Sequence, residues 1–249
     1  MRHLLVVLAC SVAVSACDSD KKKQDLLEKV GATPSASAAP TASAAPKSDR
    51  LDVVVDAQGV YAGGERVNLS LPDAAKRLAT LLAAHPIGGK RTEVTALRNA
   101  RAADVATTVA ALGDAGAPEV VVKTQDRSRK ETPLTFTPGK KAGKVPECTV
   151  VVALQKDRST ASWHLGGGTA TRYSRGMAGP DLSTTLDAVT KQVAACSSSA
   201  LVVSAEESVD WGLTFDLALA AATAQPPLKA TTWVLAPEPA VPGRPVKLD

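Results

Sequence analysis

A valine-rich run followed by a glycine-containing turn decides the fold: residues 51–69 read LDVVVDAQGVYAGGERVNL. The β-branched run predicts a strand, and the turn leads into a second short strand. Ser70-Leu71-Pro72-Asp73 follows, with Ser70 as the capping residue, an early proline and an acid three residues on, which predicts a helix start. One face of that helix should carry Leu71, Ala75, Leu78 and Leu82.

Two further strands and a second helix complete this first pattern. Residues 93–97 (EVTAL) and 120–124 (VVVKT) predict strands. Between them a helix ends at Gly113 and Gly116, and its apolar face should hold Ala102, Val105, Val109 and Leu112.

The second half of the chain repeats this order. Strands are predicted at 149–153, 200–204 and 231–235. Gly179-Pro180-Asp181 opens one helix, and residues 211–222 form the other, with Leu213 and Leu217 inward. The first of these helices should bury Leu182, Leu186, Val189 and Val193. The segment between first strand and first helix, 155–178, is longer than in the first half.

The repeat keeps its register through the middle of each half. Pro72-Asp73 matches Pro180-Asp181 at an offset of 108 (180 − 72), and two apolar positions follow at the same offset, Val94 with Val202 and Val109 with Leu217. Helices between strands favour crossover connections on one sheet face. We therefore predict an α+β fold of two tandem modules, each a small mixed β-sheet with two helices on one face.

These patterns divide the chain into six segments. They are a signal peptide (1–16), a lipidated N-terminus and Pro/Ala/Ser tether (17–50), a first module (51–124), an inter-module loop (125–148), a second module (149–236) and a Pro-rich tail (237–249). The tether lacks large apolar side chains and should reach about 30 Å as a coil. The tail should be extended and poorly packed.

The N-terminus has the order of an export signal. Met1-Arg2-His3 is followed by a short apolar run and by Ser15-Ala16. The segment Val14-Ser15-Ala16-Cys17 resembles the lipobox of bacterial lipoproteins, which implies lipidation of Cys17 and cleavage before it. An ordinary secreted protein cut near Ala16 remains the alternative.

Cysteine usage agrees with export. Cys10 would leave with the signal and Cys17 would carry lipid, so Cys148 and Cys196 remain. An even pair in an oxidising compartment predicts a disulfide, with two buried free thiols as the alternative. If the first strand and the middle strand of the second module are parallel neighbours, the two cysteines meet at their ends.

Neither composition nor motifs support catalysis. The net charge is +4, and the basic residues lack interleaved aromatics, so nucleic-acid binding is not expected. His85 and His164 are isolated, so no metal site is predicted. We interpret Gly166-Gly167-Gly168 as a hairpin turn, Glu206-Glu207 as solvated acids and Lys140-Lys141 as part of a solvated loop. No catalytic residue and no cofactor are predicted.

The first module resembles the periplasmic domain of the ExbD/TolR family. The resemblance rests on LDVVVDAQGVYAGGERV (51–67) and VTALRNARAADVATTVAALGDAGAPEVVVKT (94–124), and it extends loosely over 149–235. Family members use an N-terminal membrane helix with a proton-carrying Asp, which this sequence lacks. The resemblance therefore implies the periplasmic role alone: dimerisation, and docking to a TonB/TolA-like protein, an ExbB/TolQ-like complex or peptidoglycan.

Three functional hypotheses follow. The first is a lipid-anchored, periplasm-facing binding or accessory protein of the cell envelope, attached to the inner or the outer membrane. The second is a structural envelope lipoprotein that only forms a homodimer, and the third is an envelope hydrolase. The binding hypothesis expects each module to expose a strand edge to an extended partner segment.

Overall fold

The computed structural model describes residues 51–176 and 179–249. The predictions for 1–50, including the signal peptide, Cys17 and the tether, lie outside the described residues. The elements in chain order are β1 (Val53–Asp56), β2 (Gly59–Ala62), β3 (Glu65–Val67), α1 (Ala74–Ala83), β4 (Thr92–Ala96), α2 (Ala102–Asp114), β5 (Val120–Gln125), β6 (Glu131–Pro138), η1 (Gly139–Lys141), β7 (Val150–Leu154), β8 (Thr160–His164), β9 (Thr171–Tyr173), β10 (Arg175–Gly176), β11 (Gly179–Pro180), α3 (Leu182–Ala195), β12 (Ala200–Ala205), α4 (Trp211–Ala222) and β13 (Thr232–Leu235).

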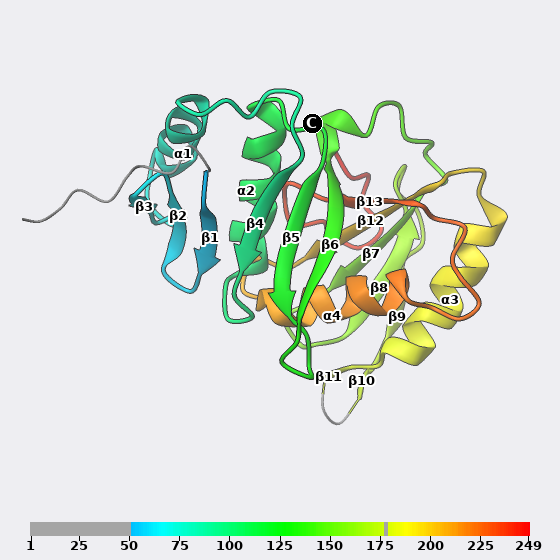
Figure 1. Ribbon diagram of the computed structural model, residues 1–249. Coiled ribbons are helices and arrows are strands. Elements are labelled where there is room, and N and C mark those ends of the chain that lie inside the picture. The colour runs from blue at the N-terminus through cyan, green and yellow to red at the C-terminus, as the bar shows by residue number, and fades with distance from the viewer. Residues whose placement is uncertain (1–50, 177–178) are drawn as a thin grey trace, which may run out of the picture. The chain divides into compact units, whose positions relative to one another are not determined.

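The predicted α+β class is confirmed, but the two small separate sheets are not. One sheet of 11 strands runs in the order β3-β2-β1-β4-β5-β6-β13-β12-β7-β8-β9, and β10-β11 form a small ribbon (Figure 1). In the first half β1 pairs antiparallel with β2 and parallel with β4. In the second half β7 pairs in the same way with β8 and β12. The two halves thus repeat one topology inside a shared sheet.

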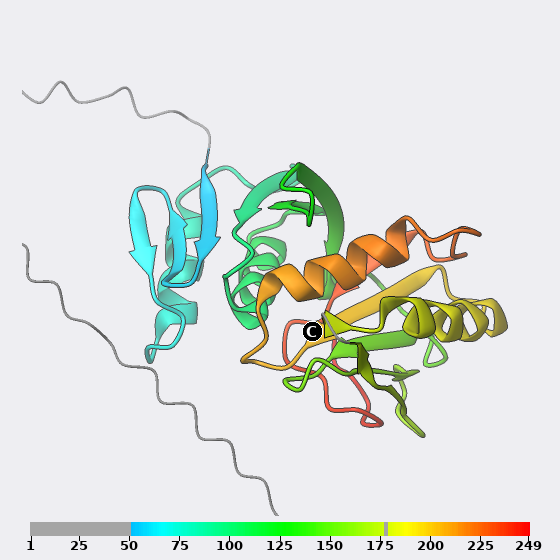
Figure 2. The ribbon, with the colours of Figure 1, turned by 90° about the horizontal axis from the view of Figure 1, so that it is seen from below.

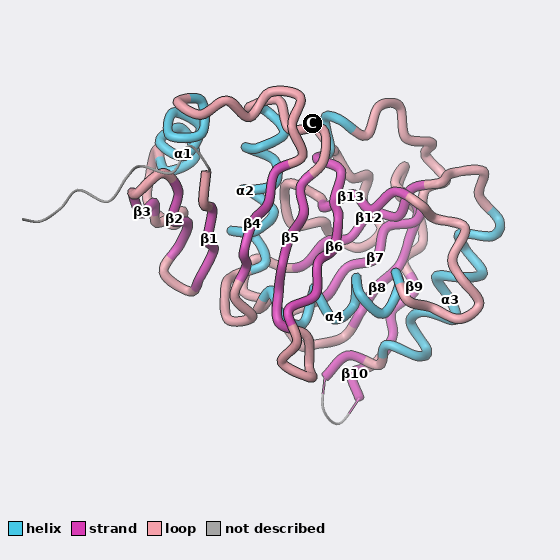
Figure 3. Tube along the Cα trace, viewed as in Figure 1, coloured by secondary structure: helices cyan, strands magenta, loops and turns pink. Residues whose placement is uncertain are grey.

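Strand β6 joins the halves, where the sequence predicted only a loop. It pairs antiparallel with β5 and parallel with β13, and Figure 3 shows it beside β5. Phe136 of β6 is fully buried and lies edge-on to Trp211 of α4, with ring centroids 6.0 Å apart. Burying an aromatic side chain outweighs the polar composition of the surrounding segment, so residues 131–138 form a strand.

All four helices contribute to one core, together with the strand residues that face them. Its largest fully buried members include Leu78 and Leu82 of α1, Leu112 of α2 and Trp211 of α4. Residues 102, 105, 109 and 112 of α2 are buried as predicted. Gly113 lies inside α2 rather than ending it. A side chain would not fit at this position, because its Cβ would lie 2.3 Å from Pro138 Cβ.

The first helix starts later than predicted. Asp73, not Ser70, is the N-cap residue, and the Ser70 amide instead donates to Asn68 Oδ1 at 3.0 Å. Leu71 is therefore outside the helix and 58% exposed. Ala74 takes the buried position that the sequence assigned to Ala75.

The opposite face of the second half has its own apolar cluster. Val151, Trp163 and Val202 belong to it, and Val246 and Leu248 of the tail pack against it. Trp163 Nε1 donates to the Arg244 carbonyl at 2.9 Å, and the Val246 amide donates to the Leu165 carbonyl at 2.9 Å. Figure 2 shows the tail (red) on the side of these strands away from α4. The prediction of a poorly packed tail is wrong, because its apolar residues cover a sheet face that no helix covers.

Candidate functional site

The shared sheet leaves two outer strand edges, at β3 and at β9. The inner edges that two separate modules would have exposed, those of β5 and β13, both pair with β6. An unpaired edge offers backbone N–H and C=O groups to another strand. The binding hypothesis therefore depends on the chemistry of β3 and β9.

The β3 edge carries charges that are already paired. Arg66 donates to Asp56 at 2.7 Å, and Arg77 of α1 pairs with Glu65. The hydrogen bond from Arg66 lowers the pKa of Asp56. Both charged residues of β3, Glu65 and Arg66, are therefore already in ion pairs.

Strand β9 is hydrogen-bonded to β8 along one edge, and its other edge pairs with no strand among the described residues. Thr171 and Tyr173 pair antiparallel with Ser162 and Thr160 of β8. Tyr173 is buried, with its hydroxyl 3.1 Å from Ser162 Oγ, whereas Thr171 and Arg172 are exposed. This strand presents a fixed backbone edge of three residues.

Four cations lie on β9, just after it, or in the β7–β8 turn. Lys156, Arg158, Arg172 and Arg175 are exposed, and none makes an ion pair within residues 51–176 and 179–249. Hydrogen bonds from Ser159 lower the pKa of Asp157, and the charge of Arg172 adds to that effect, which places Arg172 near the β7–β8 turn.

Acidic groups near this edge already have partners. Asp157 accepts from the Ser159 amide at 2.9 Å and hydroxyl at 2.6 Å. Glu206 accepts from the Lys156 backbone amide at 2.7 Å. None of the four cations forms an ion pair with these acids, although Arg172 lies close enough to Asp157 for its charge to act on that carboxylate. Strand β9 with Lys156, Arg158, Arg172 and Arg175 is called the β9 surface below.

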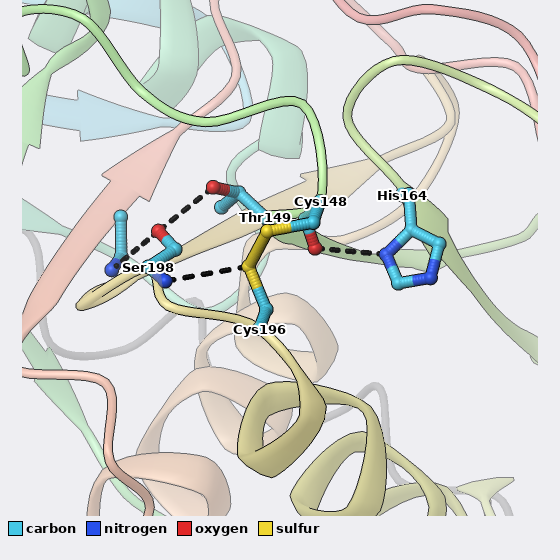
Figure 4. The surroundings of a disulfide bond; sticks show 6 residues. Cys148, Thr149, His164, Cys196 and Ser198 are labelled. Carbon is cyan, nitrogen blue, oxygen red and sulfur yellow. Dashed lines mark hydrogen bonds between the residues drawn. A yellow bond between two sulfur atoms is a disulfide. The ribbon is translucent and has the colours of Figure 1, made fainter.

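The predicted cysteine pair forms a disulfide. Cys148 and Cys196 are joined, with Cα atoms 5.7 Å apart. Cys148 lies just before β7, and Cys196 is the C-cap residue of α3, in the connection to β12, the parallel neighbour of β7. Figure 4 shows the hydrogen bonds around them: Thr149 Oγ1 donates to Ser198 Oγ at 2.7 Å, and His164 Nδ1 lies 2.8 Å from the Cys148 carbonyl oxygen. The bridge fastens the connection between α3 and β12 to the start of β7.

The other residues singled out from the sequence do not come together. His85 directly follows the end of α1, and His164 is an exposed residue at the end of β8. Gly166-Gly167-Gly168 forms the β8–β9 turn, where Gly168 donates to the Gly243 carbonyl at 2.9 Å. Glu206 and Glu207 follow β12. Lys140 and Lys141 lie in the short helical turn η1 rather than in a free loop. Lys140 is exposed, and its ammonium group pairs with Asp114 at 2.8 Å.

Within the described part of the chain, no group of three or more His, Cys, Asp or Glu side chains could hold a metal ion. No helix among these residues is long and apolar enough to cross a membrane.

The sequence reasoning missed an ion network between the halves, centred on one buried acid. Asp216 of α4 is 5% exposed and binds two arginines, Arg98 after β4 and Arg127 after β5. A single acid inside the apolar stretch LTFDLAL (213–219) is the signal that could have revealed it, since a buried carboxylate needs a cationic partner.

Comparison with protein-family models, with curated proteins and with solved structures found no match to this chain.

Proposed function

We propose that this chain is a lipid-anchored protein of the cell envelope that binds an extended, acidic segment of another envelope protein along β9. The observation that carries the proposal is the β9 surface, an open strand edge with four exposed cations that lack ion-pair partners among the described residues. Main-chain hydrogen bonds would supply affinity, and the cations would select an acidic sequence.

The proposed anchor is Cys17, which the lipobox Val14-Ser15-Ala16-Cys17 supports. The resemblance to the ExbD/TolR periplasmic domain supports a role in binding rather than catalysis. A TonB/TolA-like protein or a subunit of an ExbB/TolQ-like complex is a candidate source of the extended segment. Peptidoglycan is disfavoured at this surface because a glycan strand cannot form a β-ladder.

Homodimerisation through β9 is the weaker hypothesis. Antiparallel pairing of two copies would bring Arg172 and Arg175 of one copy toward the same residues of the other. Like charges on neighbouring strands destabilise the pairing. A second copy of this chain is therefore a poor occupant of the β9 surface.

The anchor is tested with Cys17→Ala. We expect the variant to remain an uncut precursor that a palmitate analogue does not label, because the lipid is attached to the Cys17 thiol. Metabolic labelling and the mass of the purified chain report both steps. Normal cleavage and labelling of the variant would contradict the anchor.

The β9 surface is tested with a seven-residue peptide that alternates Glu and Val and has both ends blocked. The full chain in detergent should bind it, and binding should weaken as salt rises. Arg172→Glu/Arg175→Glu should abolish binding, whereas Lys76→Glu/Lys90→Glu, which makes the same charge change on exposed first-half residues, should not.

Two peptide controls separate strand pairing from simple charge attraction. Replacing Glu by Lys removes the charge complementarity. Methylating alternate backbone nitrogens on one edge removes main-chain hydrogen bonds without changing charge. Equal binding of the methylated peptide would contradict docking by strand addition, and equal binding of the Lys peptide would contradict the electrostatic selection.

A further inference from the structure

A concave site lies away from β9, between the β5–β6 turn and the helices α3 and α4. Its volume is about 360 Å³. Asp126, Arg127 and Ser128 of the turn form a polar wall, and Leu182 of α3 with Leu219 and Ala220 of α4 form an apolar wall. This cleft is open and shallow, and its one apolar and one polar side suit a small ligand that has both characters.

Arg127 is the group that such a ligand would meet. Its Nε donates to Asp216 Oδ2 at 2.8 Å, which fixes the plane of the guanidinium. Its two terminal nitrogens have no hydrogen-bond partner among the described residues, and the side chain is 59% exposed. Arg127 therefore presents an oriented pair of free donors.

Asp216, the carboxylate to which Arg127 donates, already accepts hydrogen bonds from a second arginine. Asp216 also accepts from Arg98, from Nη1 to Oδ1 at 2.9 Å and from Nη2 to Oδ2 at 2.8 Å. Two guanidinium groups thus share one buried carboxylate, so the Arg98–Asp216–Arg127 network keeps a net positive charge. Arg127 is the more accessible end of this network, because its side chain is 59% exposed against 33% for Arg98, which also donates to the Gln125 carbonyl at 2.9 Å.

The other acid of the cleft is engaged by its own turn. Asp126 accepts from the amides of Ser128 and Lys130 and from the hydroxyls of Ser128 and Thr132. Three of these four bonds go to Oδ1 and one to Oδ2, and Asp126 forms no ion pair with Arg127.

We propose that this cleft binds the carboxylate of a small apolar residue, such as the C-terminal residue of a peptide, with Arg127 as the anchor. The two terminal nitrogens of Arg127 match the two oxygens of a carboxylate, a pairing that lysine cannot reproduce. The side chain of that residue packs on Leu182, Leu219 and Ala220.

The test uses acetyl-Ala-Leu with a free carboxylate and its C-terminal amide, titrated into the full chain in detergent by calorimetry and methyl NMR. We expect saturable binding of the acid, with shifts at Leu182 and Leu219, and at least about tenfold weaker binding of the amide. Arg127→Ala should weaken binding of the acid by at least about tenfold, and Arg127→Lys should recover only part of the loss. Lys130→Ala, an exposed cation of the same turn that does not line the cleft, should leave binding unchanged.

Several results would overturn the proposal. They are no saturable binding of the acid, equal binding of acid and amide, and no effect of Arg127→Ala. Acetate binding as tightly as acetyl-Ala-Leu would overturn the role of the apolar wall. Because the cleft and the β9 surface share no residue, Arg172→Glu/Arg175→Glu should not affect this binding, and the two proposals succeed or fail separately.

Discussion

Two aspartates in matching positions behave differently at their helix starts. Asp73 and Asp181 each precede the first residue of a helix, α1 and α3. Asp181 accepts from the Thr184 amide at 3.1 Å, whereas Asp73 has φ 61° and makes no side-chain cap. The Pro-Asp pair therefore marks both helix boundaries, but only Asp181 satisfies a free amide of its helix.

Asp181 makes the stability of the fold depend on pH. Hydrogen bonds from Ser183 and Thr184 lower its pKa below the ordinary value of 3.8. The folded state therefore binds this proton less well than the unfolded state, so the stabilisation is present above pH 3.8 and lost as pH falls through the lower folded-state pKa.

We expect Asp181→Ala to lower the melting temperature at pH 7, with a smaller difference from the native chain as pH is lowered. Asp187→Ala, an exposed acid on the same helix, is the control and should have little effect at either pH. Melting curves followed by circular dichroism measure both. A difference that stays constant down to the lowest pH would show that the carboxylate charge is not what stabilises the helix start.

At the scale of elements, the sequence predicted the strands and helices of the repeat well. Helix α4 begins and ends where its apolar pattern predicts, at Trp211 and Ala222. The parallel pairing of β7 with β12 followed from the crossover rule, and it agrees with the cysteine pair that remained after Cys10 and Cys17 were assigned elsewhere. These features were predictable because local periodicity and short-range connection rules determine them.

The register of the repeat was harder to predict. Val94 faces the helical core, but Val202, its predicted match, lies in the cluster on the opposite face. The two halves meet at an antiparallel bridge between Arg101 and Asp210, which are 109 residues apart (210 − 101). The same offset matches Val94 with Val203 and Ala96 with Ala205, all members of the helical core. A slip of one residue moves a strand residue to the other face, and sequence similarity between valines does not detect it.

Strand β6 and the tail could not be predicted from local pattern. Residues 131–138 (ETPLTFTP) contain two prolines and few apolar residues, which argues against a strand. Their stabilising contacts come from other parts of the chain: β13 alongside, and Trp211 against Phe136. The tail is similar, because its partners Trp163 and Leu165 lie far from it in sequence. For the same reason, the sequence predicted that each module exposes a strand edge but did not identify β9 as that strand.

At the scale of the whole molecule, the two halves pack as one body. Ala102 donates to the Val209 carbonyl at 2.8 Å, and Trp211 donates to the Ala100 carbonyl at 2.7 Å, so the starts of α2 and α4 hold each other by reciprocal bonds. Trp211 Nε1 also donates to Thr124 Oγ1 of β5 at 2.7 Å. These hydrogen bonds join the two halves of the chain at the starts of α2 and α4.

This shared core predicts that both halves unfold together, even after the disulfide is removed. The bridge closes a loop with a sequence separation of 48 inside the second half. Cys148→Ala/Cys196→Ala should lower the free energy of unfolding by about 4 kcal/mol. The variant should still unfold in a single transition, because the first half loses part of its core when the second half unfolds.

Urea unfolding of the full chain, followed by two probes, measures this. Tryptophan fluorescence reports the second half, where Trp163, Trp211 and Trp233 lie, and methyl NMR of Leu78 and Leu82 reports the first. Coincident midpoints in the native chain and in the variant are expected. Reduction of the native chain should reproduce the midpoint of the variant, which controls for the substitutions themselves. If the leucine signals kept their native midpoint while the fluorescence midpoint fell, the halves would be independent domains, and the reciprocal bonds between α2 and α4 would not couple them.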